Sequence, residues 1–261
     1  MSKPDPSTTH RSSKNPPPDH NGTSVLSHFC HHSLQLHAQV GALALSVDLD
    51  LTAPWTVIYG PSGSGKTSIL RALAGLLPST RLLRQNPQQN PQDLTSLAPR
   101  DRQIAYAPQQ PSLFPHLTVS QNIAFSRPSH THSTASEQDI HNILSLFHLT
   151  ALAHRYPRNL SGGERQRVNL ARAFAVPNQQ LMLLDEPFTG LDRALRDDLL
   201  PAMLTFTATH HIPVLSVTHD VEEALQLRAE VVRLQEGRIL AQGAAAEVLA
   251  AERARILNVL R

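Results

Sequence analysis

The sequence predicts an α/β domain with a mostly parallel core sheet, an antiparallel β subdomain and an inserted helical subdomain. Three late apolar segments, LMLLD, PVLSV and EVVRL, each lie beside a stretch with helical periodicity. This alternation is typical of parallel strands covered by helices on both faces. Earlier in the chain, apolar residues alternate from Leu34 to Leu51, which predicts an antiparallel strand pair turning near Gly41.

The composition is that of a globular protein and argues against several functional classes. Of the 261 residues, 40% are hydrophobic and 17% are charged, and the single cysteine, Cys30, rules out a disulfide framework. The net charge of +2, with no dense Lys/Arg block, argues against a nucleic-acid partner. No apolar run reaches the roughly 18 residues of a membrane span, and no signal peptide is evident. We therefore expect a cytoplasmic protein, or one that lies on a membrane through a partner.

Further elements follow from local periodicity. Residues 1–23 are rich in Pro, Ser, Asn and His and are predicted to be a disordered tail, leaving a folded domain over 24–261. A short buried strand, TVIYG, precedes a helix that is expected to run to about Leu76. A strand is expected over Gln103 to Ala107, and a mostly helical region from Val119 to Leu152.

A glycine-rich phosphate loop follows the strand TVIY. The segment GPSGSGKT fits G-x-x-x-x-G-K-[ST] and opens a helix, as the motif requires. Its N–H groups would bind phosphate oxygens, Lys66 would reach the β- and γ-phosphates, and the Thr67 hydroxyl would ligate Mg²⁺. A nucleoside triphosphate is therefore the expected ligand. The residues predicted to bind it here are Gly60, Pro61, Ser62, Gly63, Ser64, Gly65, Lys66, Thr67 and Ser68.

Two carboxylates end the buried strand LMLLD. Asp185 suits a second contact to Mg²⁺, and Glu186 suits a base that polarises the attacking water. The alternative is an acidic strand end that merely faces solvent. The phosphate loop in the same chain favours the catalytic interpretation.

A second helix N-terminus with anion-binding character lies in LSGGERQR, residues 160–167. A serine and two glycines open this helix, so its N–H groups suit another phosphate, which one γ-phosphate in one chain does not need. The same residues equally suit a plain helix cap at Ser161. The residues alone leave both interpretations open.

Over about residues 34–243 the sequence resembles the ABC ATPase family. The resemblance rests on the phosphate loop, the carboxylate strand, the LSGGERQR signature loop and three further markers in the family's order. Gln109 in IAYAPQQ resembles the Q-loop glutamine, Leu191-Asp192 the D-loop, and His219 in VLSVTHD the switch histidine. The family implies a P-loop NTPase cassette that hydrolyses ATP, with its helical subdomain at about 112–165.

The resemblance also implies roles for these residues. Cassettes of the family form head-to-tail dimers, so we expect a homodimer in which the signature loop of one chain closes on ATP held by the other. The residues implied at that second nucleotide contact are Ser161, Gly162, Gly163, Glu164 and Asp192. The implied catalytic residues are Glu186, which orients water, His219, which holds the γ-phosphate, and Gln109, a sensor of Mg²⁺ and nucleotide. The implied Mg²⁺ ligands are Thr67, Gln109 and Asp185.

The sequence departs from the family pattern at four places. Glu164 replaces the commoner glutamine of the signature, and Pro108 replaces the usual aromatic residue before the Q-loop glutamine. The Gln/Pro-rich stretch 81–99 predicts erosion of the antiparallel subdomain. No aromatic residue is placed to stack the adenine base, because Phe29 lies too early and Trp55 too late.

Two segments resemble importer cassettes for small oxyanions, molybdate above all. They are LFPHLTV, residues 113–119, and LLPAMLTFTATHHIPVLSVTHDVEEALQL near the end. The resemblance implies the motor subunit of a bacterial importer, peripheral on the inner face of the cell membrane. Its implied partners are a transmembrane permease, a second cassette and an external solute-binding protein. The oxyanion-binding β-domain into which molybdate-type cassettes usually continue has no counterpart before Arg261.

Three residues after the Q-loop are predicted to receive a permease loop. Leu113, Phe114 and Leu117 offer apolar side chains beside the nucleotide sensor, although they would also suit internal packing of the helical subdomain. Thiamine, sulfate and iron are alternative solutes. A soluble ABC ATPase that acts on a macromolecule is the alternative of another class, and the chain lacks the heptads or second phosphate loop typical of that class.

Overall fold

The computed structural model describes residues 32–85, 90–127 and 134–259, so the predicted tail over 1–23 lies outside the described residues. One sheet contains β3 (Trp55–Tyr59), β6 (Ile104–Ala107), β7 (Leu181–Asp185), β8 (Val214–Val217), β9 (Glu230–Gln235) and β10 (Arg238–Ala244). The other contains β1 (His32–Val40), β2 (Leu43–Leu51), β4 (Arg81–Gln85) and β5 (Gln92–Asp93). The α-helices are α1 (Lys66–Leu73), α2 (Val119–Ala124), α3 (Thr134–Leu146), α4 (Gly162–Phe174), α5 (Arg193–Thr209), α6 (Val221–Gln226), α7 (Ala245–Val248) and α8 (Ala250–Val259).

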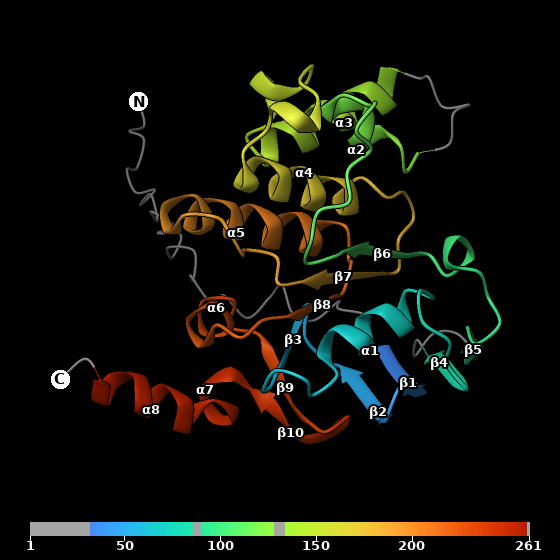
Figure 1. Ribbon diagram of the computed structural model, residues 1–261, viewed down its shortest axis with the longest axis vertical. Coiled ribbons are helices and arrows are strands. Elements are labelled where there is room, and N and C mark those ends of the chain that lie inside the picture. Colours follow the sequence, from blue (N-terminus) through green and yellow to red (C-terminus); the bar gives the residue numbers. More distant parts are fainter. Residues whose placement is uncertain (1–31, 86–89, 128–133, 260–261) are drawn as a thin grey trace, which may run out of the picture.

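The larger sheet has the order β10-β9-β3-β8-β7-β6. Strands β9, β3, β8, β7 and β6 run parallel, and β10 pairs with β9 in the antiparallel direction at the edge. Helices α2 and α3 lie far from the antiparallel strands β1 and β2, with the larger sheet between them (Figure 1). The predicted α/β class with a mostly parallel core sheet is confirmed.

The smaller sheet corrects one prediction. Strands β1 and β2 pair across Gly41, whose φ of 59° suits the turn, as the alternation predicted. Contrary to the expected erosion at 81–99, β4 pairs with β1 and β5 pairs with β4, which extends the sheet to the order β2-β1-β4-β5. Leu82 and Leu94 are fully buried beneath it. Two buried leucines and a strand-to-strand ladder therefore outweigh the polar composition of this stretch, which local composition could not indicate.

Helix α1 ends at Leu73, shortly before the predicted end near Leu76. Gly75 has a φ of 80°, and the Leu76 N–H donates to the Arg71 carbonyl at 2.8 Å. This bond closes the helix through a glycine in the left-handed conformation, which stops the α-helical ladder. The glycine, rather than the end of the apolar pattern, sets the boundary.

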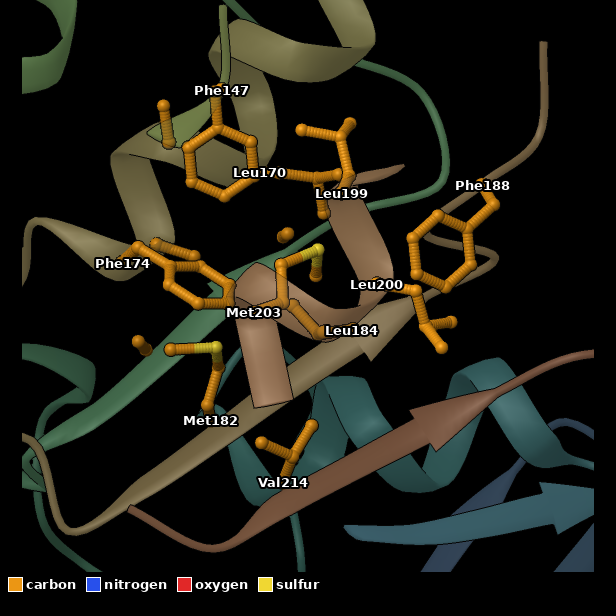
Figure 2. Close-up of a cluster of buried hydrophobic side chains, with 14 of the residues drawn as sticks. Phe147, Leu170, Phe174, Met182, Leu184, Phe188, Leu199, Leu200, Met203 and Val214 are labelled. Carbon is orange, nitrogen blue, oxygen red and sulfur yellow. The ribbon is translucent and has the colours of Figure 1, made fainter. Parts of the chain in front are cut away.

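Strand β7 separates two cores because its side chains alternate. Leu181 and Leu183 face the core shared with α1 and the antiparallel sheet. Met182 and Leu184 face the core formed with α4 and α5. Figure 2 shows the second core, in which Met182 and Leu184 lie among Phe174, Leu199 and Met203. Packing on both faces fixes the strand that ends in Asp185.

The predicted helical region after the Q-loop is present as α2, α3 and a 3-10 turn at Thr150–Leu152. Thr118 caps α2 in a reciprocal capping box with Gln121. No helix of the described ranges is long and apolar enough to span a membrane.

Candidate nucleotide site

The predicted catalytic segments meet where the parallel strands end. Gly60 follows β3, Glu186 follows β7, and His219 lies two residues beyond β8. The Glu186 N–H donates to the Val217 carbonyl at 2.9 Å, so the turn after β7 is bonded to the last residue of β8. Carboxyl ends of strands are where ligands bind in such sheets. A cavity of about 710 Å³ lies here, and its lining includes Gly60, Pro61, Ser62, Lys66, Gln109, Glu186 and His219.

The phosphate loop is held in a conformation that only glycines permit. A Cβ on Gly60 would lie 2.2 Å from the Leu234 carbonyl oxygen of β9, so the loop passes that strand too closely for any side chain. Gly65, with φ of 101°, precedes α1. The Lys66 ammonium donates to the Gly60 and Pro61 carbonyls at 2.8 Å each. Burial lowers the pKa of Lys66, an effect opposed by the carboxylates of Glu186 and Asp185.

Asp185 is the buried carboxylate of the site. Its Oδ1 accepts from the Thr67 hydroxyl at 3.0 Å, and its Oδ2 accepts from the Tyr106 hydroxyl at 3.4 Å. The residue is 1% exposed, and burial raises its pKa, although the two hydroxyls and Lys66 oppose the rise. A buried carboxylate beside a hydroxyl is a donor set that suits Mg²⁺, because a hard cation prefers oxygen ligands and offsets the desolvated charge. The predicted pair Thr67 and Asp185 therefore fits this metal.

Glu186 and His219 form a direct pair. The His219 Nδ1 lies 2.7 and 2.8 Å from the two carboxylate oxygens of Glu186. Glu186 has φ of 50°, an uncommon conformation for a residue with a side chain, and strain of this kind gathers at functional sites. The Gln166 amide supports this turn by donating to the Glu186 and Pro187 carbonyls at 3.3 and 3.0 Å. Sequence reasoning missed Gln166 because its partner lies in a distant turn.

Gln109 lies on the cavity wall, after β6. Its neighbour Pro108 offers its carbonyl to the side-chain amide of Asn169 in α4, at 2.8 Å. Thus the Q-loop is tied to the signature helix by a contact that the sequence did not predict. The unusual proline does not prevent this bond, because it uses the carbonyl rather than an N–H.

The signature loop occupies a different surface. Ser161 caps α4: its Oγ accepts from the Glu164 N–H at 3.2 Å, and the Glu164 carboxylate accepts from the Ser161 N–H at 2.6 Å. A Cβ on Gly163 would lie 3.1 Å from the Gly190 carbonyl, so this loop adjoins the D-loop of its own chain. Asp192 caps α5 by accepting from the Leu195 N–H at 2.9 Å. Among the described residues lining the 710 Å³ cavity, none comes from this second group.

Two other expectations concern aromatic residues. Trp55 is 2% exposed and donates its indole N–H to the Ser216 hydroxyl at 2.8 Å, so it belongs to the core and does not stack a base. Phe29 lies outside the described residues.

The three residues predicted to receive a permease loop, Leu113, Phe114 and Leu117, differ in what they contact. Leu113 packs against the main core. Phe114 is partly exposed, and its ring lies 4.2 Å from that of Phe125, which is 59% exposed. Asn122 shapes the loop by accepting from the Phe114 N–H at 2.9 Å and donating to the Leu117 carbonyl at 3.0 Å. Phe125 was missed because a single aromatic residue at the end of a short helix gives no periodic signal.

A phosphate loop between strand and helix, joined to a carboxylate that ends a neighbouring parallel strand, defines a nucleoside triphosphate-binding P-loop domain. The model of the ABC transporter family matches residues 46–189, and the chain belongs to that family. A solved ATP-binding cassette, a dimer in a post-hydrolysis state bound to ADP and phosphate, has a similar fold. Its TM-score is 0.69 at 24% identity, over 82% of this chain and 98% of that one.

Curated relatives are import ATP-binding proteins. The sulfate/thiosulfate import protein of Synechocystis sp. is 40% identical over 80% of this chain and 59% of its own length. The molybdenum import protein of Rhodopseudomonas palustris is 40% identical over 80% of this chain and 57% of its own. The Fe(3+) ions import protein of Pseudomonas fluorescens is 38% identical over 83% of this chain and 63% of its own. The chain therefore spans less than two thirds of the length of these relatives.

Proposed function

We propose that this protein is the ATP-hydrolysing motor subunit of a bacterial ABC importer. The observation that carries the proposal is the meeting of three groups where the parallel strands end. The phosphate loop and the Glu186–His219 pair line one cavity, and the Thr67–Asp185 pair lies next to Lys66 and Glu186 in the chain. Separate residues can therefore bind the nucleotide, ligate the metal and activate water around one phosphate group.

Hydrolysis transfers the γ-phosphoryl group of ATP to water. The N–H groups at the start of α1 and the Lys66 ammonium bind the phosphates, and Thr67, Asp185 and Gln109 would hold Mg²⁺. The metal supplies positive charge that offsets charge developing on the phosphate oxygens. The Glu186 carboxylate accepts a hydrogen bond from the attacking water, and His219 orients that carboxylate and contacts the γ-phosphate. A bond forms from the water oxygen to phosphorus as the bond to the ADP oxygen breaks, and the proton of the water passes to the Glu186 carboxylate.

The second nucleotide contact comes from another copy of the cassette. Ser161 to Glu164 and Asp192 lie outside the cavity in their own chain, which suits residues that close on ATP held by a partner in a homodimer. The dimeric solved cassette supports this arrangement.

The permease partner docks on the surface formed by Phe114, Leu117 and Phe125, beside the Q-loop, within the helical subdomain at about 112–165. Exposed apolar side chains next to the nucleotide sensor suit a contact that must report on the state of ATP. The protein is then cytoplasmic and peripheral on the inner face of the cell membrane, in a system with an external solute-binding protein. Relatives that import sulfate and molybdenum support a small oxyanion, molybdate included, as the solute.

The test compares wild type with Glu186→Gln, which keeps the side-chain size but removes the carboxylate. We expect steady-state ATP hydrolysis to fall roughly a hundredfold or more, because the water loses its acceptor. Size exclusion with ATP and Mg²⁺ should show a trapped dimer of the variant. Glu247→Gln, in α7, is the control and should match wild type in both measurements. Unchanged hydrolysis and assembly in Glu186→Gln would contradict the assignment.

A further inference from the structure

We infer that Arg196 is a positioning residue that ties the D-loop helix α5 to the switch loop carrying His219. The inference rests on the proposed function and assigns to that reaction a residue that no motif contains. It follows from an ion pair, Arg196–Asp220, that joins the first turn of α5 to the cap of α6.

Helices α5 and α6 begin beside each other, and their caps are connected. Asp192 caps α5, and Asp220 caps α6 by accepting from the Glu222 and Glu223 N–H groups. The Arg196 guanidinium, one turn into α5, donates to the Asp220 Oδ2 at 2.9 Å. One carboxylate therefore serves as the cap of α6 and as the acceptor for α5.

Burial distinguishes this ion pair from its neighbour. The Arg196 side chain is 12% exposed, and that of Asp220 is 38% exposed. Arg193 pairs with Glu222 nearby, but those side chains are 68% and 48% exposed. The Arg196–Asp220 pair is partly shielded from water through its arginine, and salt screens such a pair less than an exposed pair. Arg196 is therefore the stronger tie, and Arg193 is a natural control.

The Arg196–Asp220 ion pair lies next to the proposed catalytic pair, His219 and Glu186. Asp220 follows His219, whose ring contacts both oxygens of Glu186. On the other side of His219, the Thr218 hydroxyl accepts from the Asp220 N–H at 3.0 Å and donates to the buried Glu223 carboxylate at 2.9 Å. The residues before and after His219 are thus held by hydrogen bonds, so the position of the His219 backbone depends on this loop.

The Arg196–Asp220 pair would couple the two ATP sites of the proposed dimer through α5. Asp192 lies at the surface proposed to face the partner cassette, and α5 is a continuous helix from Asp192 past Arg196. Movement of the D-loop on dimer closure would therefore move Asp220 and set the approach of His219 to Glu186. Loss of Arg196 should impair the chemical step and leave the binding of ATP unchanged.

The experiment measures kcat and KM for ATP in Arg196→Met, Asp220→Asn, the double variant and the control Arg193→Met. Asparagine still caps a helix but loses the charge, and methionine keeps the length of the arginine stem. We expect kcat to fall about tenfold in each single variant with KM within twofold, because misplaced catalytic groups slow the chemical step. The double variant should be no slower than either single variant, since both remove one interaction. Arg196→Lys should recover part of the rate.

Amide hydrogen exchange over 218–223 tests the tie without hydrolysis. Exchange there should be faster in Arg196→Met than in Arg193→Met, with equal thermal midpoints. The inference is overturned if Arg196→Met keeps kcat within twofold of Arg193→Met, if the two single effects multiply in the double variant, or if exchange does not differ. An inactive wild type with the expected difference in exchange would overturn the proposed function and leave the tie standing.

Discussion

The two glycine-containing helix starts, at α1 and at α4, satisfy their backbone N–H groups in opposite ways. Helix α1 follows Gly65 and has no side-chain cap, and its first residue, Lys66, lines the cavity. Helix α4 follows Ser161 and has a complete capping box with Glu164. The first start has no side-chain acceptor for its N–H groups, whereas in the second the Ser161 hydroxyl accepts from the Glu164 N–H.

This difference explains why similar residues do not make equivalent sites. The α1 start lies at the carboxyl edge of the parallel sheet, beside Asp185 and Glu186, and in the proposed function it binds phosphate within its own chain. The α4 start adjoins the D-loop of its own chain, and in the proposed function it contacts a nucleotide held by a second copy. From the sequence, Ser161 could be either a helix cap or part of an anion-binding site. Within the single chain, the structure shows that Ser161 is the cap of α4.

The first comparison separates the two starts by ligand binding. Lys66→Ala should weaken ATP binding to the monomer roughly tenfold or more, because a charge-assisted hydrogen bond to phosphate is lost. Ser161→Ala should leave that affinity unchanged, since its loop is not part of the cavity. Calorimetric titration at a concentration where the chain is monomeric measures both. Equal losses in the two variants would remove the distinction between the starts.

A second comparison uses one glycine from each start. Gly60→Ala should reduce the free energy of unfolding by about 3 kcal/mol, because its Cβ would lie 2.2 Å from the Leu234 carbonyl oxygen, which cannot rotate away. A Cβ on Gly162 meets no heavy atom within 4 Å, so Gly162→Ala should change stability by less than about 1 kcal/mol. Urea unfolding measures both values. A stable Gly60→Ala variant would mean that β9 yields to the loop.

The smallest effect concerns the charge in the α4 cap. The Ser161 N–H holds the pKa of Glu164 below its ordinary value of 4.5. A lowered pKa means that the carboxylate stabilises the fold above 4.5, and that this contribution is lost as the pH falls through the lower, folded-state pKa. Wild type should therefore lose more stability than Glu164→Gln on acidification, while at neutral pH the two should differ by less than about 0.5 kcal/mol, because glutamine also completes the box. Parallel stability curves between neutral and acidic pH would exclude a role for this charge.

Local sequence patterns predicted most of the fold and most of the candidate site residues. Gly60 to Thr67, Asp185 and Glu186 could be predicted because the motif, the strand and the helix are adjacent in the chain. Gln109 and His219 depended on family resemblance, because a lone glutamine or histidine carries little information. Strands β4 and β5 were missed because their pairing with β1 is not local and their composition resembles a loop.

The sequence by itself determined the parallel sheet, the phosphate loop and the order of the catalytic segments, since periodicity and spacing are properties of neighbouring residues. Only the tertiary structure decided that Gln166 supports the Glu186 turn, that Tyr106 contacts Asp185, and that Arg196 ties α5 to the switch loop. Each of these contacts joins residues far apart in the chain. Strand order and helix packing set such distances, and no local pattern encodes them.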